Sequence, residues 1–160
     1  MHEVAEFGEL MAWLNEGVAR ALAFLKIGPG DFEVTGMWAN MNSPGAGHGL
    51  HRHPNNFLSG VYYVRVSDGA DAINFHDPRP QADIIRPPVT ALTAENTDPV
   101  VVRVRNGTLL VFPSWLAHSV DANKSDETRI SIRFNVMFSD YAKKISKPLW
   151  SAKPPAMGDG

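Results

Sequence analysis

Histidine is concentrated in one short stretch of the chain. Three of the six histidines fall within HGLHRHP, at positions 48, 51 and 53, and a fourth, His118, follows the apolar run TLLVFPSWLA. Residues two apart in an extended segment point the same way, so His51 and His53 present both imidazoles to one point. Two ligands from one strand and a third from a neighbouring strand form a facial set that leaves coordination positions open on a metal ion. By itself the His-x-His pair is a weak signal, because such pairs are more often surface or hydrogen-bonded histidines.

The remaining residue types limit the ligands of such a site. The chain has no cysteine, which excludes thiolate ligands, disulfides and cysteine nucleophiles. A metal site must therefore use His, Asp or Glu, and His53 is the favoured third ligand, with a carboxylate such as Asp77 as the alternative. His48 is expected to lie in a mobile glycine-rich loop, His76 to be structural or to face a substrate, and His2 to be terminal.

A basic residue stands in TRISIRFNVMF, a segment that otherwise has the pattern of a buried strand. Arg129 and Ser131 share one face of this strand, and that face carries no acid. Burial of a guanidinium without a partner is costly. A dicarboxylate ligand would remove this cost, because Arg binds a carboxylate through two parallel charge-assisted hydrogen bonds and a serine hydroxyl can add a third. Arg133 is a weaker candidate on the same face. The alternative is a surface ion pair between Arg129 and Asp126 or Glu127.

A helix and a series of strands are predicted around these residues. Apolar side chains recur at steps of three and four from Val4 to Ile27, which predicts a helix that packs one face on a core and stops at Gly28-Pro29-Gly30. Strand patterns follow in FEVTGMWANMN, LSGVYYVRV, AINFHDPRP, VVVRVRNGTLLVFP and TRISIRFNVMF. The fourth of these is broken at Asn106-Gly107, a dipeptide typical of hairpins. The irregular stretch from Pro80 to Pro99 has the length of a lid over a site.

The first predicted strand changes character along its length. Phe32, Val34, Trp38, Asn40 and Asn42 are expected on one side of FEVTGMWANMN, so an apolar face ends in two amides. The amides either end the strand or line a polar pocket. Trp38 and Asn40 are therefore candidates for contact with a ligand.

Length and composition predict one mainly β domain. With 160 residues, 44% hydrophobic and 20% charged, the chain is large enough to bury a core. One helix followed by about seven strands with Gly and Pro turns indicates a sandwich or barrel. We expect a single domain over residues 1–142 and a partly disordered tail over residues 143–160.

Charge and hydropathy argue against several partners. The formal charge is -2 and no run of Lys or Arg is present, so nucleic acid is not expected as a partner. No stretch of about 18 uncharged apolar residues occurs, so no membrane span is expected. The N-terminal residues lack the apolar core of a signal peptide, and we therefore expect a cytoplasmic protein.

Taken together, the motifs resemble the iron(II)- and 2-oxoglutarate-dependent oxygenases. The resemblance rests on the order H-x-H-P-N, a strand ending in YYV, GTLLVFPSWLAH and TRISIRFNV, and it covers roughly residues 38 to 138. More narrowly, the chain resembles the small bacterial and phage branch, and the prolyl hydroxylases share the overall layout. The resemblance implies a double-stranded β-helix, or jelly roll, of the cupin-like kind. It also implies iron(II) and 2-oxoglutarate as cofactors and a hydroxylase of a small-molecule or peptide substrate. A homodimer is left open.

The resemblance also assigns roles to residues. His51 and His118 match the two metal histidines, Arg129 matches the residue that binds the distal carboxylate of 2-oxoglutarate, and Ser131 matches the serine of an Arg-x-Ser pair. Tyr63 falls where related enzymes place a tyrosine hydroxyl on the same carboxylate, and Asn40 joins these residues as a candidate for the cofactor pocket. Position 53 departs from the family, because the general superfamily has Asp or Glu there. The catalytic and metal set is therefore expected to be His51, His53 and His118.

Two other classes remain open on the sequence. A cupin-type metal protein, such as an isomerase, thiol dioxygenase or sensor, would use the same His-x-His, and Gly107, Pro113 and His118 are close to the second cupin motif. Cupins usually have Glu about four residues after the pair, however, where this chain reads PNNF. The other class is a metal-free binding module with the same barrel.

Overall fold

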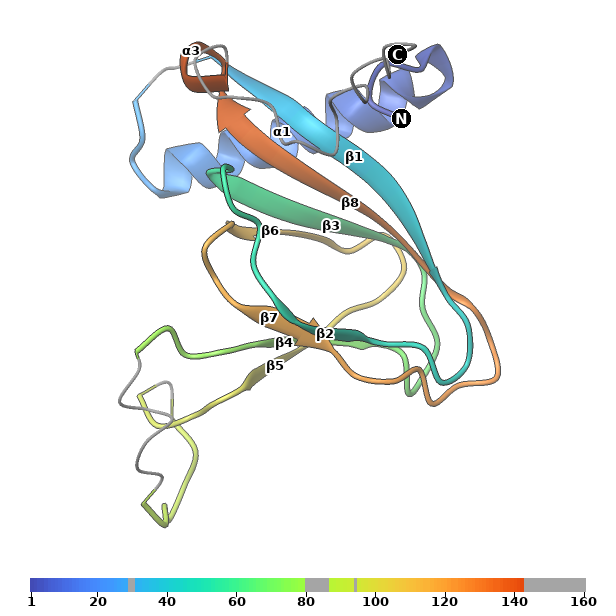
Figure 1. Cartoon of the computed structure of the whole chain (residues 1–160), viewed down its shortest axis with the longest axis vertical. Coiled ribbons are helices and arrows are strands. Elements are labelled where there is room, and N and C mark those ends of the chain that lie inside the picture. Colours follow the sequence, from blue (N-terminus) through green and yellow to red (C-terminus); the bar gives the residue numbers. More distant parts are fainter. Residues whose placement is uncertain (29–30, 80–86, 94, 143–160) are drawn as a thin grey trace, which may run out of the picture.

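The computed structural model describes residues 1–28, 31–79, 87–93 and 95–142. Two antiparallel sheets face each other, and a long helix lies along the outer side of one of them (Figure 1). Each sheet has four strands, and all adjacent pairs except one join strands that are not consecutive in the sequence. This arrangement confirms the predicted jelly roll. None of the helices in the described part of the chain has the length and apolar character needed to span a lipid bilayer.

Successive strands lie in different sheets, except for the fourth and fifth strands, which lie in the same sheet. In the order of pairing, the major sheet contains β1 (Phe32–Asn42), β8 (Arg129–Phe138), β3 (Leu58–Arg65) and β6 (Leu109–Pro113). The minor sheet contains β2 (His48–His51), β7 (His118–Val120), β4 (Ala72–Phe75) and β5 (Val100–Arg103). The helices are the short η1 (Ala5–Phe7), the long α1 (Gly8–Phe24) and the short α3 (Ser139–Ala142).

Helix α1 covers the outer face of the major sheet. Its buried residues Leu14, Val18 and Leu22 pack in one cluster with Phe134 and Val136 of β8. Burial of a large aliphatic side chain contributes about 1.5–3 kcal/mol, so these contacts stabilise the docked helix. The helix is therefore held on the sheet by the apolar stripe that its sequence predicts.

The helix ends earlier than its sequence predicts. Its last residue is Phe24, and Lys26 follows with a φ of 56°, in the left-handed region. The Ile27 N–H then donates to the Leu22 carbonyl at 3.0 Å, a bond that closes the last turn. The predicted end at Ile27 is therefore three residues too late, because a left-handed lysine ends the helix before the Gly-Pro-Gly sequence. Residues 29–30 lie outside the described part of the chain.

A β-bulge at Thr35 gives β1 two orientations. Val34 pairs with Val136 and Gly36 with Asn135, so Thr35 has no partner on β8. One extra residue moves the following side chains to the other face of a sheet. Phe32 and Val34 consequently pack with Met37 in the cluster under α1, whereas Trp38, Asn40 and Asn42 face the minor sheet. The prediction that Phe32 and Val34 share one face with Trp38, Asn40 and Asn42 is wrong for this reason.

The Asn106-Gly107 sequence forms a turn but not a hairpin. Gly107 has a φ of 81°, and the Thr108 N–H donates to the Arg105 carbonyl at 3.0 Å. The strands on either side pair in different sheets, β5 with β4 and β6 with β3. The side-chain carbonyl of Asn106 accepts a hydrogen bond from the Val66 N–H at 2.7 Å, which fixes this corner to the end of β3. The predicted hairpin is wrong because the turn carries the chain from one sheet to the other.

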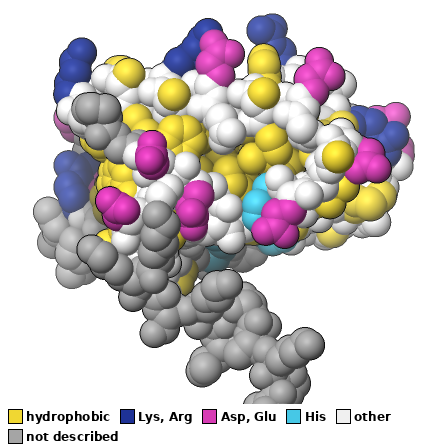
Figure 2. Space-filling model, turned by 90° about the horizontal axis from the view of Figure 1, so that it is seen from above, with side chains coloured by type: hydrophobic (Ala, Val, Ile, Leu, Met, Phe, Trp, Pro, Cys, Tyr) yellow, Lys and Arg dark blue, Asp and Glu magenta, His cyan; other side chains and the backbone are white. Residues whose placement is uncertain are grey.

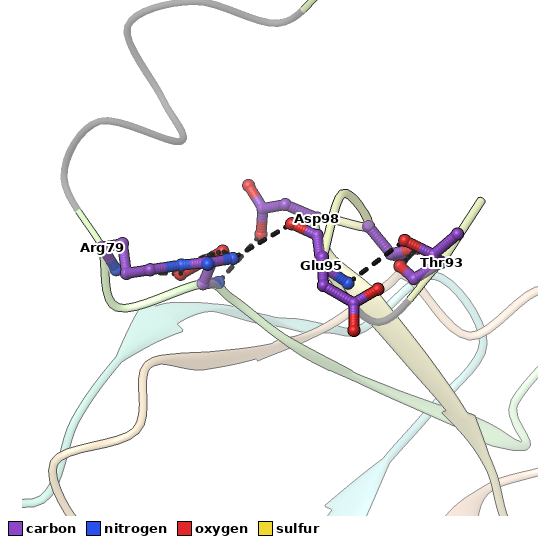
Figure 3. A network of polar contacts seen from close by, with 6 residues as sticks. Arg79, Thr93, Glu95 and Asp98 are labelled. Atoms are coloured by element: carbon purple, nitrogen blue, oxygen red, sulfur yellow. Dashed lines mark hydrogen bonds and ion pairs between the residues drawn. The ribbon is translucent and has the colours of Figure 1, made fainter. Parts of the chain in front are cut away.

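A polar network joins the two ends of the predicted lid. Figure 3 shows Arg79 beside the part of the chain that carries Glu95 and Asp98. Asp98 accepts a hydrogen bond from the Asp77 N–H at 2.9 Å, and Arg79 donates to the Glu95 carbonyl at 3.2 Å. Residues 80–86 and 94 lie outside the described part of the chain, so the lid stays a prediction. The predicted tail, residues 143–160, also lies outside it.

Charged side chains are dispersed over the face shown in Figure 2. Among the described residues of that face, Lys and Arg side chains lie apart from one another with Asp and Glu between them, and hydrophobic side chains occupy the middle. That face therefore has no continuous basic patch of the kind that gathers phosphates.

Candidate metal centre

Three histidines converge at one end of the space between the sheets. His51 and His118 are paired across β2 and β7, with ring centroids 4.2 Å apart. The ring of His53 lies 5.1 Å from that of His51 and 5.2 Å from that of His118. One ligand atom from each histidine lies within 4.8 Å of the others, and no other such group of three occurs among the described residues. This spacing suits a single metal ion bound by all three rings.

Backbone contacts outside a regular strand position His53. Strand β2 ends at His51, so His53 lies in the connection that follows and not in the same strand. Its N–H donates to the Ser114 carbonyl at 3.0 Å. The expectation that both histidines lie in one extended strand is only partly correct, although the two rings do lie close together.

A buried serine and asparagine network supports this contact, and sequence reasoning missed it. The Ser59 hydroxyl donates to the Asn135 side-chain carbonyl at 2.8 Å and lies 2.9 Å from the Ser114 hydroxyl. Since Ser59 has one hydrogen to give, Ser114 is the donor in the second bond. The network links β3 and β8 to the residue that holds His53. Its only signal in the sequence is the presence of polar residues in two otherwise apolar strands.

Hydrogen bonds to backbone carbonyls fix the tautomers of two rings. Nδ1 of His51 lies 2.8 Å from the Gly49 carbonyl oxygen, and Nδ1 of His118 lies 2.9 Å from the Leu116 carbonyl oxygen. A carbonyl only accepts, so each Nδ1 must carry the proton. The Nε2 atoms then keep their lone pairs for a metal ion, which is the usual arrangement of metal-binding histidines.

Burial keeps two of the three histidines neutral at physiological pH. Burial lowers the pKa of His53 to about 4, with further contributions from the charges of His51 and Arg133. Burial likewise lowers the pKa of His118 to about 4, although the hydrogen bond to Leu116 opposes this shift. A metal ion binds the neutral imidazole, so little energy is lost in removing protons at neutral pH.

The other ligand candidates are engaged elsewhere. Asp77 forms hydrogen bonds with Arg79 (Figure 3), Nε lying 2.9 Å from Oδ1 and 3.0 Å from Oδ2, and these bonds lower the pKa of Asp77 to about 2. His48 has its ring 6.2 Å from that of His51, with Nδ1 3.4 Å from the Asn42 amide nitrogen. His76 lies 2.9 Å from the Ser119 hydroxyl. None of them joins the three-histidine group.

A polar row faces this centre from the major sheet. Asn40, Ser131 and Tyr63 lie opposite one another in the pairing of β1, β8 and β3. Tyr63 is 2% exposed, and burial raises its pKa to about 12 against the opposing effect of Arg129 and Arg133. Tyr63 therefore offers a neutral hydroxyl at any physiological pH. Its neighbour Tyr62 packs against Trp13 of α1 instead.

Arg129 is buried and under-satisfied. It is 3% exposed, and its guanidinium donates to the Asn42 side-chain carbonyl at 3.3 Å and to the carbonyls of Ala70 and Ala72 at 3.5 Å each. These bonds are long, and burial lowers the pKa of Arg129. The alternative of a surface ion pair with Asp126 or Glu127 is wrong, because Glu127 instead accepts a hydrogen bond from Ser67. Asn42, left open on the sequence, proves to be a partner of Arg129.

Three buried donors on the inner face of the major sheet lack partners. Among the described residues, the buried side-chain nitrogens without a hydrogen bond include Asn40 Nδ2, Arg129 Nε and Arg133 Nε. All three are donors and two belong to cations, so the face requires acceptor atoms with negative charge. A dicarboxylate such as 2-oxoglutarate fits this requirement, just as a divalent cation fits the three imidazoles.

The fold and these two groups of residues define a jelly-roll protein whose histidine centre faces a wall of buried donors without partners. The chain belongs to the family described as "Putative 2OG-Fe(II) oxygenase", whose model matches residues 36–135. The predicted resemblance to the iron(II)- and 2-oxoglutarate-dependent oxygenases is thus confirmed, while the narrower bacterial and phage branch stays a prediction. No curated protein matches the chain.

Solved structures with the same fold include several oxygenases. An oxidoreductase of the 2OG-Fe(II) oxygenase family from Burkholderia pseudomallei has a TM-score of 0.56 at 17% identity, over 80% of this chain and 56% of that one. A prolyl-4-hydroxylase from Pseudomonas putida has a TM-score of 0.54 at 17% identity, over 83% and 67%. HygX from Streptomyces hygroscopicus, with nickel and 2-oxoglutarate bound, has a TM-score of 0.53 at 12% identity, over 76% and 64%. The chain thus spans little more than half of the Burkholderia protein.

Proposed function

We propose that this protein is an iron(II)- and 2-oxoglutarate-dependent dioxygenase that hydroxylates a small-molecule or peptide substrate. The observation that carries the proposal is that two incomplete sites face each other across the space between the sheets: three imidazoles that no carboxylate of the described residues joins, and a face of unpartnered donors without an acceptor. The family membership supports the same conclusion. A cytoplasmic location is part of the proposal, and the oligomeric state is left open.

The iron would be held by His51, His53 and His118. When bound, iron(II) and 2-oxoglutarate supply the oxidation of a substrate C–H bond by dioxygen, which yields the alcohol, succinate and carbon dioxide. The protein supplies the Nε2 atoms of His51 and His118 through the hydrogen bonds to Gly49 and Leu116. Because no carboxylate of the described residues joins the three rings, a bound metal would keep its full charge and would attract a dianion more strongly than a metal in a carboxylate-containing triad.

The 2-oxoglutarate would be oriented by Arg129, Ser131, Tyr63 and Asn40. Arg129 offers a guanidinium already desolvated by the fold, and charge-assisted bonds gain strength in such an environment. Tyr63 stays protonated because burial raises its pKa to about 12, so it can donate to the same carboxylate.

Apolar side chains limit the access of water to the centre. Phe112 and Phe75 lie with their ring centroids 4.9 Å and 6.2 Å from that of His118. They pack with Val61 and Ile73 in the cluster between the sheets. Exclusion of water lowers the local dielectric constant, which strengthens the hold of charged groups on substrates.

Anaerobic titration separates binding of the two cofactors. We expect iron(II) to bind the wild-type protein, and subsequent 2-oxoglutarate to produce the visible charge-transfer absorption of a keto acid chelated to iron(II). Arg129→Met should weaken 2-oxoglutarate binding by about 10–100-fold, because charge-assisted hydrogen bonds each contribute about 1.5–3 kcal/mol, and should leave iron affinity within about threefold. Arg20→Met is the matched control, since Arg20 is exposed on α1 and pairs with Glu16.

Release of succinate in air with iron, ascorbate and 2-oxoglutarate then tests turnover. Iron binding with an unchanged spectrum after addition of 2-oxoglutarate would instead favour a cupin-type metal protein. Purified protein that binds no metal at all would favour the binding module. Equal loss of iron and 2-oxoglutarate in Arg129→Met would mean that Arg129 supports the fold and is not the anchor.

A further inference from the structure

A second buried guanidinium, that of Arg133, faces the space between the sheets and is not one of the residues assigned to orient 2-oxoglutarate. Arg133 is 6% exposed and pairs in register with Trp38 of β1 and Val61 of β3. Its Nε is buried without a hydrogen bond. Within the described part of the chain, no hydrogen bond or ion pair satisfies this side chain.

Arg133 lies nearer the histidine centre than Arg129 does. In the register of β1 and β8, Arg133 pairs with Trp38, whereas Arg129 pairs with Asn42 at the end of β1. The Trp38 ring lies 6.1 Å from the ring of His53. Arg133 is thus next to the side chain that contacts the histidine centre.

Among the described residues, no carboxylate compensates this charge. The groups whose electrostatic effect reaches Arg133 are Arg129, another cation, and Tyr63, whose phenol stays neutral. A buried cation without a counter-ion destabilises the folded state. Binding of an anionic ligand next to Arg133 would offset this loss of stability.

The proposed cofactors leave positive charge unmatched. Iron(II) and the two guanidiniums bring more positive charge than the two carboxylates of 2-oxoglutarate can balance. The keto acid end would occupy the metal and the distal carboxylate would occupy Arg129, so Arg133 keeps free donors after both cofactors are bound. The remaining charge favours an anion close to the reacting position.

We propose that Arg133 binds an oxyanion group of the primary substrate, a carboxylate, sulfonate or phosphate, and holds it beside the metal against the indole of Trp38. This inference rests on the proposed function and deepens it, because it gives the chemical class of the substrate. Arg133 is a substrate-binding residue in this assignment, distinct from the cosubstrate anchor Arg129. Its fork of N–H groups suits the planar or tetrahedral arrangement of such oxygens.

Titration with a simple anion tests the assignment on the full chain. The protein is loaded with Zn(II), which does not react with dioxygen, and with saturating 2-oxoglutarate, and inorganic sulfate is then added at constant ionic strength under calorimetry. Wild-type protein should show saturable sulfate binding, which Arg133→Gln should weaken by at least about tenfold and Arg133→Lys should partly retain. The exposed Arg20→Gln variant serves as the control and should match the wild type.

Unfolding temperature gives an independent readout. Arg133→Met removes the uncompensated charge, so the metal-free variant should unfold at a higher temperature than the wild type. Sulfate should raise the unfolding temperature of the wild type and leave that of Arg133→Met unchanged. If Arg133 only stabilised the fold, metal-free Arg133→Met would instead unfold at a lower temperature than the wild type.

The outcomes separate this inference from the proposed function. Affinity for 2-oxoglutarate should stay within about threefold of wild type in Arg133→Gln, since the anchor is Arg129. Loss of 2-oxoglutarate binding in Arg133→Gln with retention in Arg129→Met would make Arg133 the anchor and overturn the inference alone. Equal sulfate binding in wild type and Arg133→Gln, or none in either, would also overturn it. Failure of the wild type to bind 2-oxoglutarate would overturn the proposed function, whatever sulfate does.

Discussion

The Nδ1 atom of His118 lies 2.9 Å from the carbonyl oxygen of Leu116, and this contact determines which nitrogen of the ring can meet the other two histidines. The same relationship holds between His51 and Gly49 at 2.8 Å. Two of the three rings are therefore oriented before any metal arrives. Such preorganisation lowers the entropy lost on binding.

Replacement of His118 should remove most of the metal affinity. His118→Ala deletes one of three ligands, and we expect cobalt(II) or iron(II) affinity to fall at least about 100-fold, more than the 10–100-fold typical of losing an outer partner of a ligand. The control is His76→Ala, because His76 bonds to Ser119 and lies outside the three-histidine group. Comparable metal affinity in the two variants, measured by calorimetry, would exclude His118 as a ligand.

Position 53 is expected to accept a carboxylate ligand. His53→Asp restores the triad usual in the superfamily and replaces a neutral ligand by an anion, so metal binding should persist. Affinity for 2-oxoglutarate should decrease because the metal centre is less positive. Anaerobic iron titration followed by 2-oxoglutarate titration measures both quantities. His53→Ala is the companion variant, and unchanged metal affinity in it would remove His53 from the ligand set.

Tyr63 should lower the stability of the wild-type protein at alkaline pH. Burial raises the pKa of Tyr63 from 10.0 to about 12, so the folded state keeps the phenol neutral while the unfolded chain loses the proton earlier. The associated contribution to stability is complete below pH 10 and declines as pH rises towards about 12. The difference in unfolding free energy between wild type and Tyr63→Phe should change in that pH range. A constant difference from pH 9 to pH 11 would contradict the burial of this hydroxyl.

Gly60 is required by the close approach of β3 and β8. It pairs with Phe134, and a Cβ added at Gly60 would lie 2.1 Å from the phenyl ring. Gly60→Ala should therefore destabilise the protein by about 1–3 kcal/mol or more, as expected for an overpacked core. Gly8→Ala is the matched control, since nothing lies within 4 Å of its added Cβ. Denaturant unfolding of both variants measures the difference, and equal midpoints would show that the ring moves without cost.

Local patterns predicted the elements well because each pattern reflects a local cause. The apolar stripe of α1 and the strand limits of β1 follow from side-chain period, which depends only on neighbours in sequence. The errors occurred where distant segments decide the outcome. The bulge at Thr35 depends on pairing with β8, and the corner at Asn106-Gly107 depends on which sheet each flanking strand joins.

The residue types of the candidate site could be predicted from the sequence, but most of its hydrogen-bond contacts could not. Arg129 could be singled out because a cation in an apolar strand is conspicuous, and the structure buries it as that reasoning requires. This reasoning could not find the Arg129 partner Asn42 or the network from Asn135 to Ser114. The type of a polar residue does not indicate which distant residue it will bind by a hydrogen bond. The sequence alone also does not show that the guanidinium of Arg133 is buried without a partner for its Nε.

Because Thr35 is unpaired, the two halves of β1 turn the same alternate positions to opposite faces of the sheet. Before the bulge these positions are apolar and face α1, and after it they carry the amides and face the interior. The number of residues in the strand consequently determines which side chains face the interior. Loss of a single residue there would turn Asn40 and Asn42 towards α1 and bring Met37 and Met41 inside, so that thioethers would replace amides in the interior. Length variation in this strand is therefore compatible with a working interior only in steps of two.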